Sequence, residues 1–211
     1  MKRLLTCGLL ALTAAAIPAA AFAQFSMPSL PGKSAGGNQA DLGGQQTALV
    51  KNFVAANVDV LKANSRMADA LGLKGKAGDA DATVQSLSSG ATDKDSASKA
   101  ATAVGDTSGA IAAKLAEKPQ LDAAAKTTFA AGLVHLVSGA RKFSGMGKDV
   151  SAMGNGLKSA SPMQLTSLGA AAYVVSNFPT SASNVTNVLK NAIDFARSNG
   201  IEVPADATSA L

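Results

Sequence analysis

The segment 129–157 constrains the fold of this chain most strongly, because its small and apolar residues recur every seven positions. The first row is Phe129, Leu136, Phe143, Val150 and Leu157. A second row lies three positions later and consists of Gly132, Gly139, Met146 and Met153, and a third lies four later, at Leu133, Ala140, Gly147 and Gly154. Seven residues make almost two helical turns, so the three rows share one face that would extend about 42 Å. We therefore predict a long central helix over residues 120–158, on which the other helices pack.

The glycines of this segment argue against a continuous helix, because glycine has a low helix propensity. Gly145, Gly147, Gly154 and Gly156 lie in its second half, and each costs about 1 kcal/mol relative to alanine in a helix. That cost makes a break near 145–147 conceivable. The seven-residue rhythm nevertheless runs across the glycines without interruption, so we predict a helix that continues and can bend there.

Residues 1–23 have the pattern of a secretory signal peptide. A basic start (MKR) precedes an apolar run over 4–22, and small residues stand at positions 21 and 23. This pattern predicts cleavage after Ala23 and a periplasmic or secreted protein. The apolar run is close to the length of a membrane span, so an uncleaved anchor is the alternative. Residues 24–44 contain two prolines and five glycines, which predicts a flexible lead-in.

The chain that remains after this cleavage has a modest charge and no cysteine. The whole sequence has a net charge of +5, and Lys2 and Arg3 account for two of its positive charges. The lysines and arginines that remain are spread along the chain, which argues against nucleic acid as a partner. Because the single cysteine, Cys7, belongs to the leader, disulfides and thiolate metal sites are excluded. The fold must therefore be stabilised by its core, which suits a bacterial periplasm.

Helix signals recur outside the central helix, and no segment alternates like a strand. We predict helices over residues 45–71, from Asp79 to about residue 90, and over 93–118. Ser161 and Pro162 mark the start of a helix that Pro179 should end at residue 177 or 178, and a last helix should run from 180–183 to Gly200. The fold class is therefore all-α: an antiparallel bundle of five or six helices in one domain, 45–203, followed by a short tail, 204–211.

Asn57 and Asn64 are seven residues apart on the first predicted helix. Two amides at the edge of a helix seam could fix the register of the helix against a partner helix. A position at the solvent-exposed rim is the simpler interpretation, and it is the one we favour.

Few residues suggest chemistry. His135 is the only histidine, and it lies beside the apolar face of the central helix. A zinc site needs three or four ligands, and a nucleophile needs a partner that no motif supplies. We therefore interpret His135 as a residue at the rim or one bonded to a backbone carbonyl. We predict that the protein is not an enzyme and that it has no catalytic residue, no metal site and no cofactor.

The sequence favours a non-catalytic binding or interaction module of the bacterial cell envelope. Its partner would be another protein or a small apolar ligand, and Met146 and Met153 are candidate contacts because methionine adapts to irregular surfaces. The alternative is a peripheral membrane protein. The apolar runs at 129–140 and 165–178 could lie in a membrane interface, and Arg141, Lys142 and Lys148 could face anionic lipid. His135 completes the set of candidate contact residues.

Overall fold

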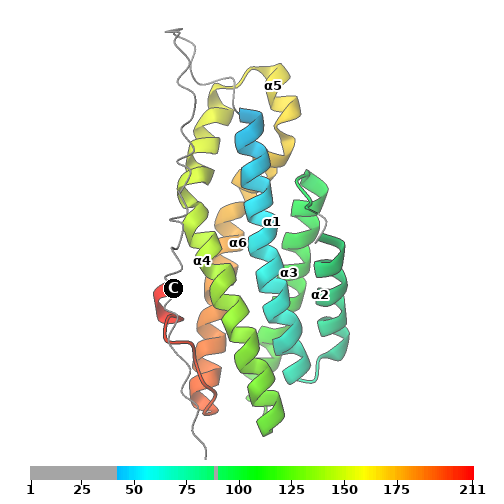
Figure 1. Ribbon diagram of the computed structural model, residues 1–211, viewed down its shortest axis with the longest axis vertical. Coiled ribbons are helices and arrows are strands. Elements are labelled where there is room, and N and C mark those ends of the chain that lie inside the picture. The colour runs from blue at the N-terminus through cyan, green and yellow to red at the C-terminus, as the bar shows by residue number, and fades with distance from the viewer. Residues whose placement is uncertain (1–41, 88–89) are drawn as a thin grey trace, which may run out of the picture. The chain divides into compact units, whose positions relative to one another are not determined.

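A computed structural model describes residues 42–87 and 90–211, all within one compact unit. These residues form helices and no strand, so the all-α prediction is confirmed (Figure 1). The helices are α1 (Leu42–Ala70), α2 (Lys74–Leu87), α3 (Lys94–Ala116), α4 (Ala123–Ser159), α5 (Pro162–Ser167) and α6 (Gly169–Ser198), followed by a short 3₁₀ helix, η1 (Thr208–Ala210).

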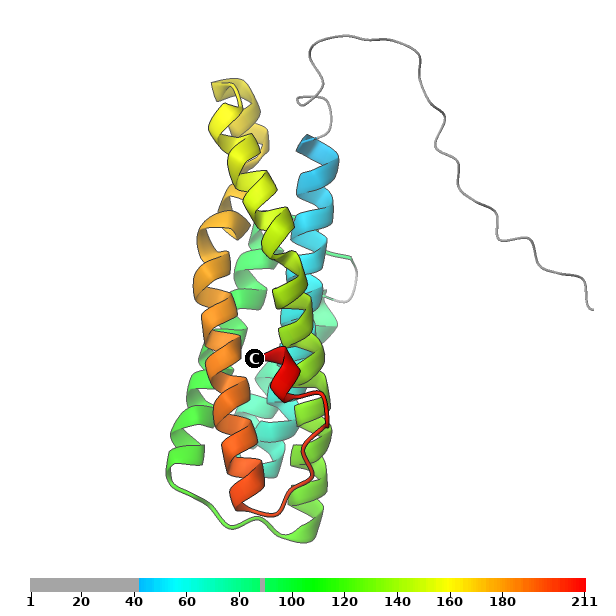
Figure 2. The same ribbon diagram turned by 90° about the vertical axis from the view of Figure 1, so that its left-hand side faces the viewer.

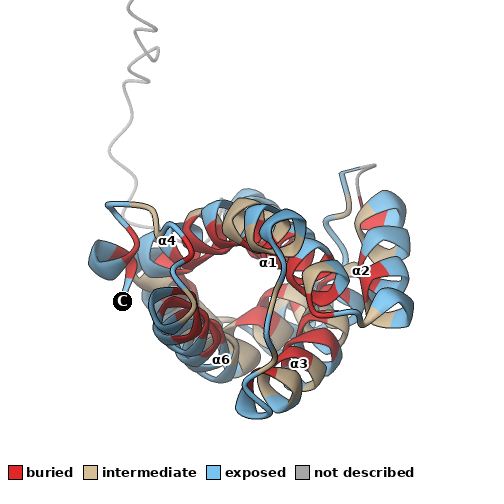
Figure 3. Cartoon of the chain, turned by 90° about the horizontal axis from the view of Figure 1, so that it is seen from below, coloured by how far each residue is buried: buried red, intermediate tan, exposed pale blue. Residues whose placement is uncertain are grey.

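Four of these helices surround the core. Seen along their axes, α1, α4, α6 and α3 form a ring with their buried residues facing inward (Figure 3). The remaining long helix, α2, lies outside this ring against α1 and α3. The long helices that follow one another along the chain run in opposite directions (Figure 1). The small side chains of α3 and the longer apolar ones of α1, α4 and α6 therefore meet in one core.

The central helix predicted from the heptad pattern is α4. It runs without a break through 37 residues, including the glycines near 145–147. The first row of its heptad pattern is buried at Phe129, Leu136, Phe143 and Val150, whereas Leu157 is half-buried near the end. Because the glycines at 145 and 147 are flanked by the buried side chains of Phe143, Met146 and Val150, packing outweighs their low helix propensity.

Two glycines of the second row let α4 approach α1 closely. A Cβ atom at Gly132 would lie 2.8 Å from the Cγ atom of Met67. At Gly139 it would lie 2.6 Å from a methyl carbon of Val60 and 3.2 Å from the carbonyl oxygen of Ala56. All three distances are shorter than ordinary van der Waals contact, so a side chain at either position would force the side chains or the backbone of α1 to move.

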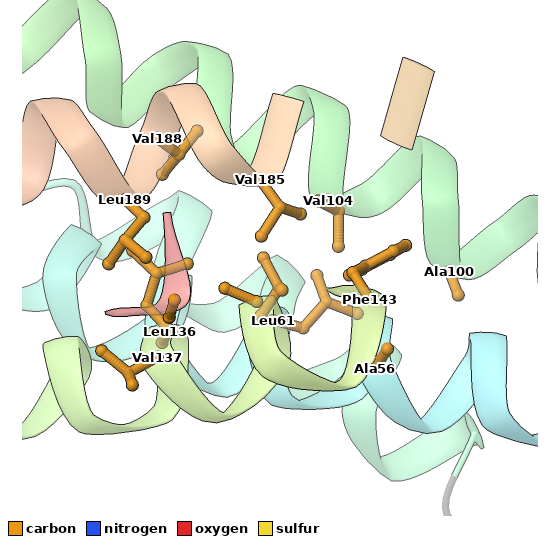
Figure 4. Packing of buried hydrophobic residues seen from close by; sticks show 14 of the residues in the cluster. Ala56, Leu61, Ala100, Val104, Leu136, Val137, Phe143, Val185, Val188 and Leu189 are labelled. Carbon is orange, nitrogen blue, oxygen red and sulfur yellow. The ribbon is translucent and has the colours of Figure 1, made fainter. Parts of the chain in front are cut away.

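Large side chains fill the core between the four helices. Leu61 of α1, Val104 of α3, Phe143 of α4 and Val185 of α6 are all buried and lie close together (Figure 4). Phe143 also contacts the ring of Phe53, at 5.8 Å between centroids in an edge-to-face arrangement. The interior is therefore aromatic and aliphatic at its centre.

The helix boundaries are predicted well where a cap is present. Gly72 has a φ of +76°, and the Leu73 amide donates to the carbonyl of Ala68, which closes α1 as expected. Gly200 closes α6 in the same way, with the Ile201 amide bonded to Ala196.

Two predicted boundaries near the start of the described chain are wrong. Helix α1 begins at Leu42, inside the predicted flexible lead-in 24–44, because the Leu42 side chain is buried against Gly156. Helix α2 begins at Lys74 and not at Asp79, because Ala77 and Ala80 are buried in the bundle. The predicted signal peptide and its cleavage site lie outside the described residues.

The predicted end of a helix at Pro179 is also wrong. Pro179 lies within α6 at an exposed position, and the helix continues through it although the proline has no backbone N–H to donate. The break comes at Leu168 instead, between α5 and α6. The Gln46 side chain of α1 stabilises it, because its amide nitrogen donates to the Ser167 carbonyl and its oxygen accepts from the Ala171 amide. The capping box that starts α5 at Ser161 is present as predicted.

The favoured interpretation of the two asparagines is wrong, because Asn57 and Asn64 are both fully buried. The amide of Asn64 donates to the hydroxyls of Thr107 and Ser108, at 2.8 and 2.9 Å. These bonds cross from α1 to α3 and fix the register of the pair, which is the alternative that the spacing suggested. The amide of Asn57 donates within α1, to the Phe53 carbonyl.

The tail after α6 packs against the bundle. The 3₁₀ helix η1 lies on α4 (Figure 2). Ala207 and Ala210 are buried, and Asp206 forms an ion pair of 2.7 Å with Arg141. The residues predicted as a short tail therefore contribute to the packing of α4.

Candidate functional site

An open cleft between the C-terminal half of α3 and the end of α6 has the size and lining of a ligand site. It encloses about 520 Å³. Its lining residues are Ala112, Leu115, Ala116, Lys118, Gln120, Asn191, Asp194, Phe195, Ser198 and Asn199. Small-molecule sites commonly measure 300–1,000 Å³ and combine an apolar lining with a few polar groups.

The cleft arises from the small side chains of α3. Ala112 and Ala116 leave space where longer residues would fill the gap to α6, and the buried side chains of Leu115 and Phe195 form an apolar floor. The polar residues Asn191 and Asp194 are three positions apart on α6 and therefore lie on the same face. An apolar molecule with one polar end would fit this arrangement.

The turn after α3 contributes a cation to the cleft. Helix α3 ends at Ala116, and Lys118 follows with a φ of +52°, an uncommon backbone conformation for a residue other than glycine. Its amide donates to the Leu115 carbonyl, which closes the helix. The turn thus places Lys118 in the same cleft lining as Asp194.

Sequence reasoning did not identify this cleft. The sequence of α3 is rich in small residues, but which helix lies opposite them depends on the three-dimensional fold. No motif connects residues 112–120 with residues 191–199, so only the packing of α3 on α6 brings them together.

The two methionines proposed as partner contacts are core residues. Met146 and Met153 are only 3% and 1% exposed, and both belong to the buried face of α4. The structure therefore places both side chains in the core of the folded bundle, where neither reaches the surface.

The two basic candidates are held by acidic residues of the same chain. Arg141 pairs with Asp206, and the Lys142 ammonium lies 2.7 Å from a carboxylate oxygen of Asp59. Ser138 donates a second hydrogen bond to Asp59. Burial alone would raise the pKa of Asp59, but the hydrogen bonds from Lys142 and Ser138 outweigh it, and the pKa lies below its usual value. Arg141 and Lys142 are therefore exposed residues that are both engaged in ion pairs within the chain.

His135 is half-buried at the side of α4 that faces α1 and α2. Loss of solvent and the positive charges of Arg66 and Lys62 lower its pKa, while Asp59 has the opposite effect. The structure thus places His135 at the edge of the core, in a groove with residues of α1 and α2 and away from the cleft between α3 and α6.

Within the part of the chain that is described, no three histidine, cysteine or acidic side chains are close enough to hold a metal ion. None of the helices over 42–87 and 90–211 is both long and apolar enough to cross a membrane. Comparison of the chain with protein-family models, with curated proteins and with solved structures found no match. The class that the fold defines is an all-α helical bundle.

Proposed function

We propose that this protein is a non-catalytic binding module of the bacterial cell envelope, and that it holds a small, mostly apolar ligand in the cleft between α3 and α6. The cleft itself carries the proposal. It joins the apolar floor of Leu115 and Phe195 to the polar groups of Asp194 and Lys118, in a volume of about 520 Å³. The leader-like pattern at residues 1–23 supports export.

Binding of the neutral apolar fluorophore N-phenyl-1-naphthylamine tests the proposal. Saturable fluorescence enhancement is expected for the purified protein. Ala112→Trp would place an indole in the cleft and should weaken binding by at least about tenfold, since filling the space removes the apolar contact area.

Ala113 provides a matched control for this substitution. It is the next residue of α3, it is exposed, and it does not line the cleft. Ala113→Trp should leave the affinity unchanged. Fluorescence that does not saturate, or equal weakening in both variants, would contradict a site in this cleft.

The alternative of peripheral membrane binding has a narrower basis. Met163 and Leu165 of α5 are 86% and 44% exposed and offer an apolar surface. Against it, Arg141 and Lys142 are already paired with acidic residues. Flotation with anionic vesicles at low salt tests this alternative. Co-flotation that Met163→Ser abolishes would favour membrane contact over the ligand cleft.

A further inference from the structure

A second groove runs along the outer side of α1, between α2 and α4. It encloses about 670 Å³ and is separate from the cleft between α3 and α6. Three helices contribute basic and neutral polar residues to its lining, namely Lys62, Ser65 and Arg66 of α1, Gln85 of α2, and Thr128 and His135 of α4.

The register of α1 on α4 places His135 beside the two cations. Gly132 of α4 lies against Ala63 and Met67, and Gly139 lies against Ala56 and Val60. His135 falls between these two contacts, and therefore opposite the segment of α1 that bears Lys62 and Arg66. These two residues are four positions apart, so they lie on the same side of α1.

Within the described part of the chain, the basic side chains of the groove have no partners in ion pairs, whereas the acidic side chains of α1 do. Among the described residues, neither Lys62 nor Arg66 forms an ion pair. The acidic residues of α1 are paired with other cations, because Asp69 pairs with Lys74 at 3.2 Å and Asp59 pairs with Lys142 at 2.7 Å.

Two acidic residues line the groove, Asp69 of α1 and Asp81 of α2. Asp69 is paired with Lys74, so among the described residues Asp81 is the carboxylate of this lining that forms no ion pair. The two cations Lys62 and Arg66 therefore share the lining with one unpaired carboxylate. Loss of solvent lowers the pKa of His135 most, and the charges of Arg66 and Lys62 lower it further against the opposing effect of Asp59. The electrostatic potential produced by these neighbouring groups favours an anion.

We propose that this groove binds the phosphate group of a small ligand through Lys62, Arg66 and His135. A guanidinium binds two oxygens of one phosphate, and an ammonium and a ring N–H can serve the others. Gln85, Ser65 and Thr128 add neutral polar groups around them. The groove thus contains more hydrogen-bond donors than a carboxylate, with its two oxygens, could use. The number of donors therefore favours a phosphate over a carboxylate as the ligand. This site goes beyond the proposed apolar cleft and does not depend on it.

The single histidine makes the test direct. The imidazole resonance of His135 can be followed by proton NMR in the whole purified protein, in sodium phosphate and in sodium chloride of equal ionic strength. Phosphate binding should raise the pKa of His135 by about one unit, because an adjacent anion stabilises the imidazolium. Arg66→Gln should abolish the difference between the two salts.

Arg141→Gln is the control, because Arg141 is paired with Asp206 and does not line the groove. It should retain the phosphate-dependent shift. Phosphatidylglycerol vesicles provide a second arm, and a shift with vesicles but not with free phosphate would identify a lipid headgroup as the source of the phosphate. No shift with either, or a shift that persists in Arg66→Gln, would overturn the proposal.

Discussion

At the scale of single residues, His135 links electrostatics to stability. Its pKa is lower in the folded protein than its usual value, so the unfolded chain binds a proton more readily. The folded protein should therefore lose stability as the pH falls below about 6.5, down to the folded pKa of His135, and no such loss is expected at higher pH.

His135→Gln should remove this part of the acid sensitivity. The measurement is urea unfolding at pH 5 and pH 8, in buffers without phosphate, for the original protein and the variant. The difference in unfolding free energy between the two pH values should be smaller in the variant. An equal difference would mean that His135 does not titrate in the way its surroundings imply.

Asn64 is the residue whose polar contacts matter most to packing. Asn64→Ala removes two buried hydrogen bonds to α3 and leaves a small cavity, so it should lower the unfolding free energy by about 2–4 kcal/mol. Asn177→Ala is the control, because Asn177 is partly buried and bonds only to the Tyr173 carbonyl of its own helix. Similar losses in both variants, measured by urea unfolding, would contradict a special role of Asn64 in the register of α1 and α3.

At the scale of elements, glycines of one helix should respond in opposite ways. Gly139→Ala should destabilise the protein by about 1–3 kcal/mol, because its Cβ atom would clash with Val60 and with the backbone of α1. Gly145→Ala meets no atom within 4 Å and should stabilise by up to about 1 kcal/mol through helix propensity. Chemical unfolding of both variants measures the difference, and stabilisation by both would show that α1 and α4 are not in close contact.

Pro179 offers a second test within α6. Pro179→Ala restores a backbone donor at an exposed helical position and should stabilise the protein by about 1–2 kcal/mol, after allowance for the more flexible unfolded chain. Thermal unfolding followed by circular dichroism measures the gain. A loss of stability would indicate that the packing of α6 depends on the irregularity that proline introduces.

Helix boundaries could be predicted where neighbouring residues determine them, and not where contacts with distant parts of the chain do. The ends at Gly72, Gly200 and Ser161 are determined by local backbone chemistry, so they could be predicted. The break at Leu168 depends on Gln46, which is more than 120 residues away in sequence. The helical conformation at Pro179 depends on which face of α6 meets solvent, and this information is absent from a local pattern.

At the scale of the whole molecule, the heptad rows predicted which face of α4 is buried, because periodicity reflects burial directly. The rows did not predict what packs opposite each face, and for that reason the cleft between α3 and α6 and the groove around Lys62 emerged only from the fold. Met146 and Met153 belong to the second of these rows, and both are buried as the rows imply. A candidate site needs positions from several helices, whereas the buried face of one helix can be predicted from that helix's own sequence.

Helix α4 is one continuous helix on which the other helices of the bundle pack. Native-state hydrogen exchange of residues 143–150 tests this continuity most directly, because these amides span the glycines where a break was conceivable. Their protection should match that of the amides around Leu136, as expected for a helix that opens only with the core. Exchange of residues 143–150 at the rate of an unstructured chain, while residues 130–140 stay protected, would show that the helix is broken and contradict the account.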